Sequence, residues 1–237
     1  MNAQQLLREW LPPAMYRWLR QSRLPRIGAR SLHDIDRQLA QILPPRGVYI
    51  EIGANDGLTQ SNTWWLERDR GWKGLLIEPA LNRFLELQQN RSGQNVFACA
   101  ACVPSDFPHP FVRMTYADLM TTTGDVELLD VDRKEHHRAA SDHAPRQVPF
   151  LATARCLSDL IDESGLGSEI DFFSLDVEGA ELEVLGGLDF SRHRPTRILV
   201  ETRRKELVDA VLIQHGYGPA RALSIHDYLY ELPPTVV

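Results

Sequence analysis

Residues 48–58 read VYIEIGANDGL, a run of strand-forming residues that ends in a turn of small and polar residues. Branched and aromatic side chains favour a buried strand. When such a strand ends at glycines and a helical segment follows, the usual reason is that a ligand must approach the backbone closely. We therefore expect Gly53 and Gly57 to form part of a ligand site at the end of this strand.

The chain on either side of this turn alternates between strand-like and helix-like segments. Apolar runs predict strands at 74–79, 95–101, 170–176, 197–202 and 228–232, and amphipathic patterns predict helices at 63–70, 82–90, 157–164, 180–186 and 205–215. Regular alternation of this kind indicates an α/β fold with a mostly parallel, doubly wound, Rossmann-like sheet and helices on both faces.

The expected organisation is an N-terminal helical arm, residues 1–46, followed by a single domain, residues 47–237. Within the arm, Ser31 is placed to cap a helix over residues 32–43. Within the domain, residues 104–150 interrupt the alternation with prolines and with His109, His136, His137 and His143. We interpret this segment as an insertion or lid.

The amino-acid composition excludes several classes of protein. The 237 residues are 43% hydrophobic and 24% charged, as in ordinary globular proteins, and the net charge of −6 argues against a nucleic-acid partner. The cysteines, Cys99, Cys102 and Cys156, are too few for a disulfide framework and indicate a reducing compartment. No apolar run is long enough to span a membrane and the first residues lack the pattern of a signal peptide, so we expect a cytoplasmic protein.

The first 30 residues are basic in an otherwise acidic chain, with six arginines and a single acid, Glu9. Leu11, Met15, Trp18 and Leu19 fall on one face of a helix that Pro12 and Pro13 can open. One interpretation is weak peripheral contact with an anionic membrane. The simpler one is a helix packed on the domain with its arginines in solvent.

The residues in and around the first turn distinguish between two kinds of nucleotide-like cofactor. A dinucleotide site needs a middle glycine against the pyrophosphate, and Asn55 stands at that position. Glu51 on the strand would repel a pyrophosphate but suits a cationic ligand. Glu78, which ends the next strand, lies at the spacing at which such folds place a carboxylate on ribose hydroxyls. Together these acids predict S-adenosylmethionine, with a nicotinamide-dependent oxidoreductase as the alternative.

These residues also resemble a known family, the FkbM-type methyltransferases. The resemblance covers residues 47–218 and rests on YIEIGANDG at 49–57, LIEP at 76–79, IDFFSLDVEGAELEVLGGL at 170–188, ILVET at 198–202 and HGY at 215–217. It implies a class I fold and an S-adenosylmethionine-dependent enzyme that methylates a hydroxyl of a sugar, glycan or secondary metabolite. The expected cofactor site comprises Glu51, Gly53, Asn55, Gly57, Glu78 and Pro79.

Methyl transfer needs a group that positions the acceptor and removes its proton. Asp176 ends a strand at the edge where such sheets bind ligands, and Glu178 follows two residues later. We predict these two as catalytic residues and predict no metal, although Glu201 ends the neighbouring strand and two such carboxylates could hold a magnesium ion. The acceptor is expected to be a small molecule or glycan. A non-catalytic glycan-binding module is the remaining alternative.

Overall fold

The computed structural model describes residues 31–116, 122–123 and 148–234. Within them a central sheet has the strand order β10-β11-β9-β8-β1-β2-β3. Its parallel strands are β1 (Val48–Ile52), β2 (Lys73–Ile77), β3 (Val96–Ala98), β8 (Phe172–Leu175) and β9 (Arg197–Glu201), and its antiparallel edge is β11 (Asp227–Glu231) with β10 (Arg221–Ala222). The expected doubly wound, Rossmann-like α/β fold is confirmed.

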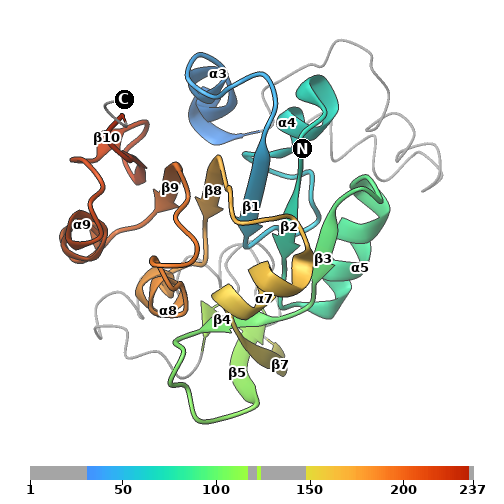
Figure 1. The fold of residues 1–237 in the computed structure, drawn as a ribbon. Helices are drawn as coiled ribbons and strands as arrows, with labels where there is room; N and C mark the ends of the chain where they lie inside the picture. The colour runs from blue at the N-terminus through green and yellow to red at the C-terminus, as the bar shows by residue number, and fades with distance from the viewer. Residues whose placement is uncertain (1–30, 117–121, 124–147, 235–237) are drawn as a thin grey trace.

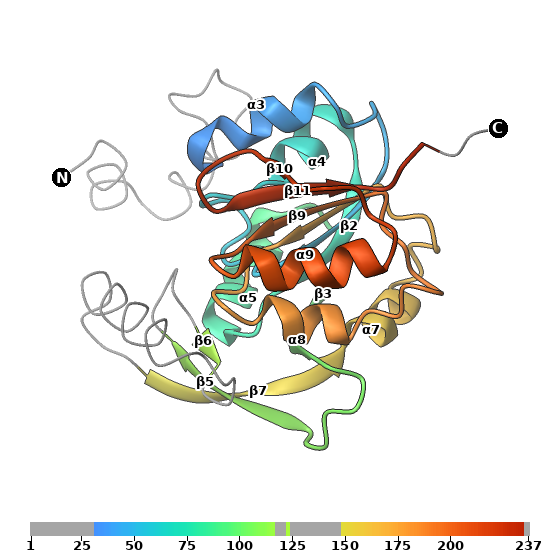
Figure 2. The same cartoon turned by 90° about the vertical axis from the view of Figure 1, so that its left-hand side faces the viewer.

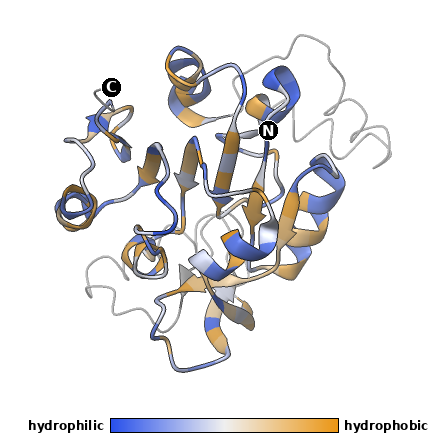
Figure 3. Cartoon of the chain, viewed as in Figure 1, coloured by the Kyte–Doolittle hydropathy of each residue, from blue (hydrophilic) through white to orange (hydrophobic). Residues whose placement is uncertain are grey.

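Helices cover both faces of this sheet (Figure 1). On one face lie α7 (Leu157–Ser164), α8 (Glu181–Gly186) and α9 (Lys205–Gln214), whose apolar side chains join Ile50 and Ile52 of β1 in one core cluster. On the other lie α3 (Ile35–Ala40), α4 (Trp64–Arg70) and α5 (Leu81–Asn90), packed with Tyr49 in a second cluster. Because successive strand residues point to opposite faces, β1 feeds both cores, and the hydrophobic colouring of the strands follows this burial (Figure 3).

The helix expected over residues 32–43 is shorter in the structure. A 3-10 turn (Leu32–Asp34) precedes α3, and Ser31 Oγ accepts a hydrogen bond from the backbone N–H of Asp36 at 2.8 Å. The N-cap position of α3 is Asp34, so the prediction that Ser31 caps a helix over residues 32–43 was wrong, although its hydroxyl does contact the first turn of α3. The first 30 residues, including the predicted amphipathic helix, lie outside the described residues.

A second, smaller sheet with the order β4-β7-β5-β6 lies beside the main one (Figure 2). It consists of β4 (Ala101–Val103), β5 (Phe111–Tyr116), β6 (Thr122–Thr123) and β7 (Val148–Cys156). The prediction of one strand over 95–101 was wrong, because the chain leaves the main sheet after Ala98 and starts β4 in the small sheet. Most of the segment interpreted as an insertion, including His136, His137 and His143, lies outside the described residues.

The sheet order sets the position of any ligand. β2 and β8 flank β1 on opposite sides, so the chain connections diverge at the carboxyl ends of β1 and β8. In open parallel sheets the crevice at such a switch point is where ligands bind.

Candidate active site

A cavity of about 290 Å³ opens at this switch point. Seven of the eight predicted site residues line it: Glu51, Gly53, Asn55, Glu78, Pro79, Asp176 and Glu178. Glu201 also contributes to the wall, and the small sheet adds Ala101, Cys102 and Met114 on the opposite side. Gly57 does not line the cavity. The structure thus brings these residues from six segments of the sequence to one site.

Glu78 follows β2 and has a buried carboxylate held by the backbone. Its Oε2 accepts the N–H of Asn55 at 2.9 Å and its Oε1 accepts the N–H of Ala80 at 2.8 Å. Burial raises the pKa of Glu78 to about 7, although both hydrogen bonds favour the ionised form. Each oxygen keeps a further lone pair for a ligand hydroxyl.

Asn55 supplies an unsatisfied acceptor in the same wall. Its φ of 48° lies in the left-handed region, which asparagine tolerates better than most residues. Its side-chain Oδ1 is buried and has no hydrogen-bond partner. Since a buried acceptor without a partner costs free energy, this atom fits a ligand that brings a donor.

Gly53 and Gly57 are required for a reason other than ligand approach. A Cβ on Gly53 would lie 1.8 Å from the carbonyl oxygen of Asp176, and one on Gly57 would lie 2.6 Å from Leu87 Cδ1. Both have positive φ, 79° and 73°. Gly53 therefore lets the β1 turn pack against the end of β8, and Gly57 lets it pack against α5. A bulky side chain at Gly53 would therefore collide with protein backbone, so the expectation that this glycine is needed for close approach of a ligand is corrected.

The carboxylate of Glu51 is engaged inside the protein. It accepts hydrogen bonds from the hydroxyls of Ser61 at 2.9 Å and Thr63 at 2.6 Å, and pairs with Arg91 at 3.1 Å. Glu51 lines the cavity, but its charge is balanced by a buried guanidinium.

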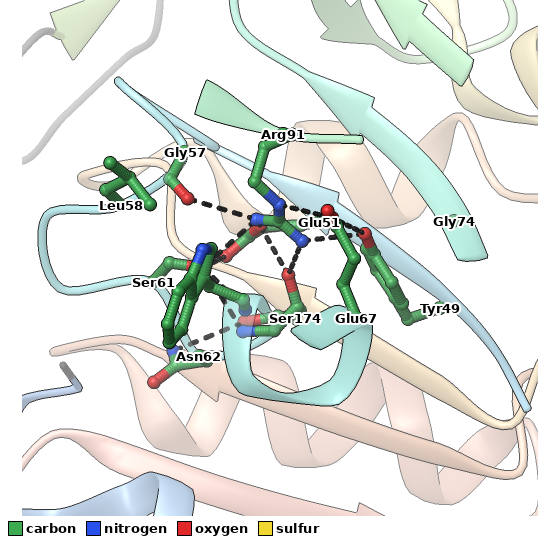
Figure 4. Close-up of polar contacts among 12 residues, drawn as sticks. Tyr49, Glu51, Gly57, Leu58, Ser61, Asn62, Glu67, Gly74, Arg91 and Ser174 are labelled. Atoms are coloured by element: carbon green, nitrogen blue, oxygen red, sulfur yellow. Dashed lines mark hydrogen bonds and ion pairs between the residues drawn. The ribbon is translucent and has the colours of Figure 1, made fainter. Parts of the chain in front are cut away.

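Arg91, which the sequence did not single out, is the centre of this network (Figure 4). Its side chain is fully buried, and its Nε pairs with Glu67 at 2.7 Å. Its remaining nitrogens donate to the hydroxyls of Tyr49 and Thr63 and to the carbonyl oxygen of Gly57. A single side chain thus ties β1, the glycine turn and α4 together. A polar residue directly after a helix gives no signal of this role in the sequence.

Asp176 ends β8 beside Glu201 at the end of β9. Burial, and then the charges of Glu201, Glu178, Asp227 and Glu181, raise the pKa of Asp176 well above its usual range. Burial and the same acidic neighbours raise the pKa of Glu201 to about 7, while a hydrogen bond with Asp176 acts in the opposite direction. Neighbouring carboxyls that repel one another hold a proton up to a higher pH than an isolated carboxyl does. Such a group is suited to accept a proton from a ligand near neutral pH.

Glu178 sits on a strained turn. Its φ is 50° and that of Gly179 is 102°, both in the left-handed region. Glu181 accepts the N–H of Gly179, and the guanidinium of Arg204 donates to the Gly179 carbonyl oxygen. Glu181 is only 2% exposed, and its hydrogen bond with Gly179 stabilises the turn that carries Glu178.

Three further findings concern metals, thiols and membranes. Among the described residues no group of three or more His, Cys, Asp or Glu side chains is placed to hold a metal ion. Cys99, Cys102 and Cys156 are free thiols. None of the helices in the described ranges has the length and apolar character that a membrane crossing needs.

A mainly parallel sheet with this order and a cavity at its switch point define a Rossmann-like fold with a candidate ligand site. The sequence model of the methyltransferase FkbM domain matches residues 51–218, most of the chain. The chain therefore belongs to the FkbM methyltransferase family. The resemblance seen in the sequence motifs is confirmed.

Solved structures with a related fold share little sequence with the chain. The FkbM methyltransferase of Methylobacillus flagellatus KT is 18% identical over 81% of this chain and 45% of its own, with a TM-score of 0.48. TrmK of M. capricolum, solved with S-adenosyl-homocysteine, is 10% identical over 83% and 65%, with a TM-score of 0.44. A Pyrococcus furiosus methyltransferase is 12% identical over 92% and 95%, with a TM-score of 0.41. The chain spans less than two thirds of the first two, and no curated protein matched it.

Proposed function

We propose that the chain binds S-adenosylmethionine in this cavity and methylates a hydroxyl of a sugar, glycan or secondary metabolite. The observation that supports this most is the convergence of Glu78 and Asp176, from the ends of β2 and β8, on one cavity on either side of β1. The alternative of a nicotinamide cofactor is not supported, because the family is one of methyltransferases.

The residues present fit this cofactor. Glu78 would accept hydrogen bonds from the ribose hydroxyls, and the unsatisfied Oδ1 of Asn55 would accept one from a further donor. When bound, S-adenosylmethionine supplies an electrophilic methyl group. Glu51, paired with Arg91, keeps the turn around the cofactor in place rather than carrying a free charge.

Asp176 is the proposed base. Its carboxylate lines the cavity, and its raised pKa makes it a better proton acceptor than an ordinary aspartate. It accepts the proton of the acceptor hydroxyl as that oxygen becomes nucleophilic. Glu178, on the strained turn beside it, would orient the hydroxyl.

The cofactor assignment is tested by calorimetry with S-adenosylhomocysteine. We expect Glu78→Ala to weaken binding by about one to two decades, because loss of a buried hydrogen-bond set costs roughly 1–3 kcal/mol. Glu86→Ala is the control, since this glutamate lies on the neighbouring helix with a 47% exposed side chain and does not line the cavity. Unchanged affinity in folded Glu78→Ala would remove Glu78 from the cofactor site.

A cytoplasmic location is part of the same proposal. All three cysteines are free, as expected for a protein kept in a reducing compartment.

A further inference from the structure

The cavity wall is acidic. Among the described residues that line it are the carboxylates of Glu51, Glu78, Asp176, Glu178 and Glu201, and these same lining residues include no lysine, arginine or histidine. Asn55 adds an unsatisfied oxygen acceptor. The wall therefore offers acceptors and negative charge, and a ligand that fits it must bring donors.

The carboxylates of the cavity wall differ in how well they are balanced along the edge of the sheet. Glu51 is balanced by the buried guanidinium of Arg91, and Glu78 accepts two backbone N–H groups. At the other end, Asp176 and Glu201 follow the adjacent strands β8 and β9 and share a hydrogen bond. Among these described acids, those without a cationic or backbone partner thus lie where β8 and β9 end, and the hydrogen bond between them requires a proton on one of the two carboxyls.

Arg204, which follows β9, does not line this end of the cavity. Arg204 donates to the Gly179 carbonyl oxygen and lies 3.9 Å from Glu181 and 4.0 Å from Glu183, and it is not part of the cavity wall. The raised pKa values of Asp176 and Glu201 have the same origin, because each carboxyl is buried among other acids.

We propose that the acceptor presents a protonated amine to Asp176 and Glu201, close to the hydroxyl that is methylated, and that phosphorylated or carboxylated acceptors are excluded. An anion at this end would add to the repulsion between buried carboxylates, whereas an ammonium group relieves it and satisfies their lone pairs. This inference rests on the proposed function and narrows its substrate class to aminated hydroxyl compounds.

The first test compares two nucleosides by calorimetry in EDTA. Sinefungin carries a protonated amine where the transferred methyl group would be, and S-adenosylhomocysteine carries no charge there. We expect sinefungin to bind wild-type protein on the order of tenfold more tightly, because its amine points toward the acceptor end. Equal affinities overturn the inference but leave the proposed function standing. Failure of both to bind overturns the proposed function and the inference with it.

A matched pair of variants assigns the effect to Glu201. Glu201→Gln keeps the shape of the side chain and removes its charge, so it should reduce the preference for sinefungin roughly threefold or more and leave S-adenosylhomocysteine affinity within about twofold. Glu206→Gln makes the same change at an exposed position on α9, outside the cavity wall, and should leave the preference unchanged. An unchanged preference in folded Glu201→Gln contradicts the assignment.

The second test places the charge on the acceptor rather than on the cofactor. The complex with S-adenosylhomocysteine is titrated with glucosamine, glucose and glucuronate, followed by saturation-transfer NMR. We expect glucosamine to bind most tightly and glucuronate most weakly, with the difference reduced in Glu201→Gln. The absence of a preference for glucosamine, whether the three sugars bind alike or none binds, overturns the inference.

Discussion

Single carboxylates at the strand ends line the candidate site, and their environments differ. Glu78 is buried but held by two backbone N–H groups, which suits a fixed binding role. Asp176 and Glu201 are buried against each other and against further acids, which suits proton transfer. Carboxylates at the ends of strands in one sheet thus differ in their surroundings, and the surroundings decide which role each can fill.

The titration of Glu201 makes stability depend on pH. Its pKa rises from an ordinary value of 4.5 to about 7 on folding, so between these values the folded chain holds a proton that the unfolded chain has released. Stability therefore falls as pH rises through this window and levels off above about pH 7. We expect Glu201→Gln to flatten this decline and to be more stable than wild type at pH 8. Urea midpoints at pH 5, 6.5 and 8 measure it, and parallel curves for both proteins would contradict it.

Methyl transfer is predicted to be independent of a metal ion. Asp176 and Glu201 do end adjacent strands, as a magnesium site would need. The next oxygen along the chain is Thr202 Oγ1, which donates to Glu181 at 3.1 Å and accepts the N–H of Arg204 at 3.0 Å. That hydroxyl is therefore occupied within the protein and is poorly placed as a third ligand.

The measurement is turnover with the acceptor in excess EDTA, followed by added magnesium. Unchanged turnover is expected in both conditions. Loss of activity in EDTA that magnesium restores would reassign Asp176 and Glu201 as metal ligands.

At the scale of elements, the buried network of Arg91 joins β1, α4 and the glycine turn. We expect Arg91→Met to destabilise the fold by about 3–5 kcal/mol, because it leaves Glu51 and Glu67 buried without their cation. Arg37→Met is the control, since Arg37 forms an exposed pair with Asp34 worth less than about 1 kcal/mol. Urea unfolding of both variants measures the difference, and equal losses would show that the network is not structurally important.

The elements that the sequence predicts well are those whose pattern is local. The strands β1, β2, β8 and β9 are continuous apolar runs because both faces of a parallel sheet are covered. β5 and β7 were missed, since residues 111–116 pair with residues 148–153 across a long separation and their faces alternate between buried and exposed. Pairing over such a distance leaves no local signal.

The residues of the candidate site likewise divide into those with a local sequence signal and those without one. Seven predicted residues meet at the cavity because strand ends converge at a switch point, which the order of motifs already implies. Arg91 acts through its contact with Glu51, and Glu181 acts through its contact with the Gly179 turn. Neither contact can be recognised from the position of the residue after or within a helix. The pairing of Gly53 with the Asp176 carbonyl oxygen likewise appears only when β1 and β8 are side by side.

At the scale of the whole molecule, the cavity is assembled from the domain and from Leu32, the first described residue that lines it. Residues 1–30 lie outside the described residues, and their six arginines remain the basis for the proposed membrane contact. Since the described wall needs none of them, deletion of residues 1–30 should leave S-adenosylhomocysteine affinity within about twofold of wild type.

The same deletion should reduce sedimentation with vesicles that contain anionic lipid. Each arginine near such a surface contributes about 1 kcal/mol, and salt screens this attraction, so binding of the full chain should also fall when ionic strength rises. Arg17→Gln with Arg20→Gln in the full chain is the matched variant, because it removes charge and keeps length. Equal sedimentation of all three proteins, including none by any, would contradict membrane contact and favour a helix packed on the domain.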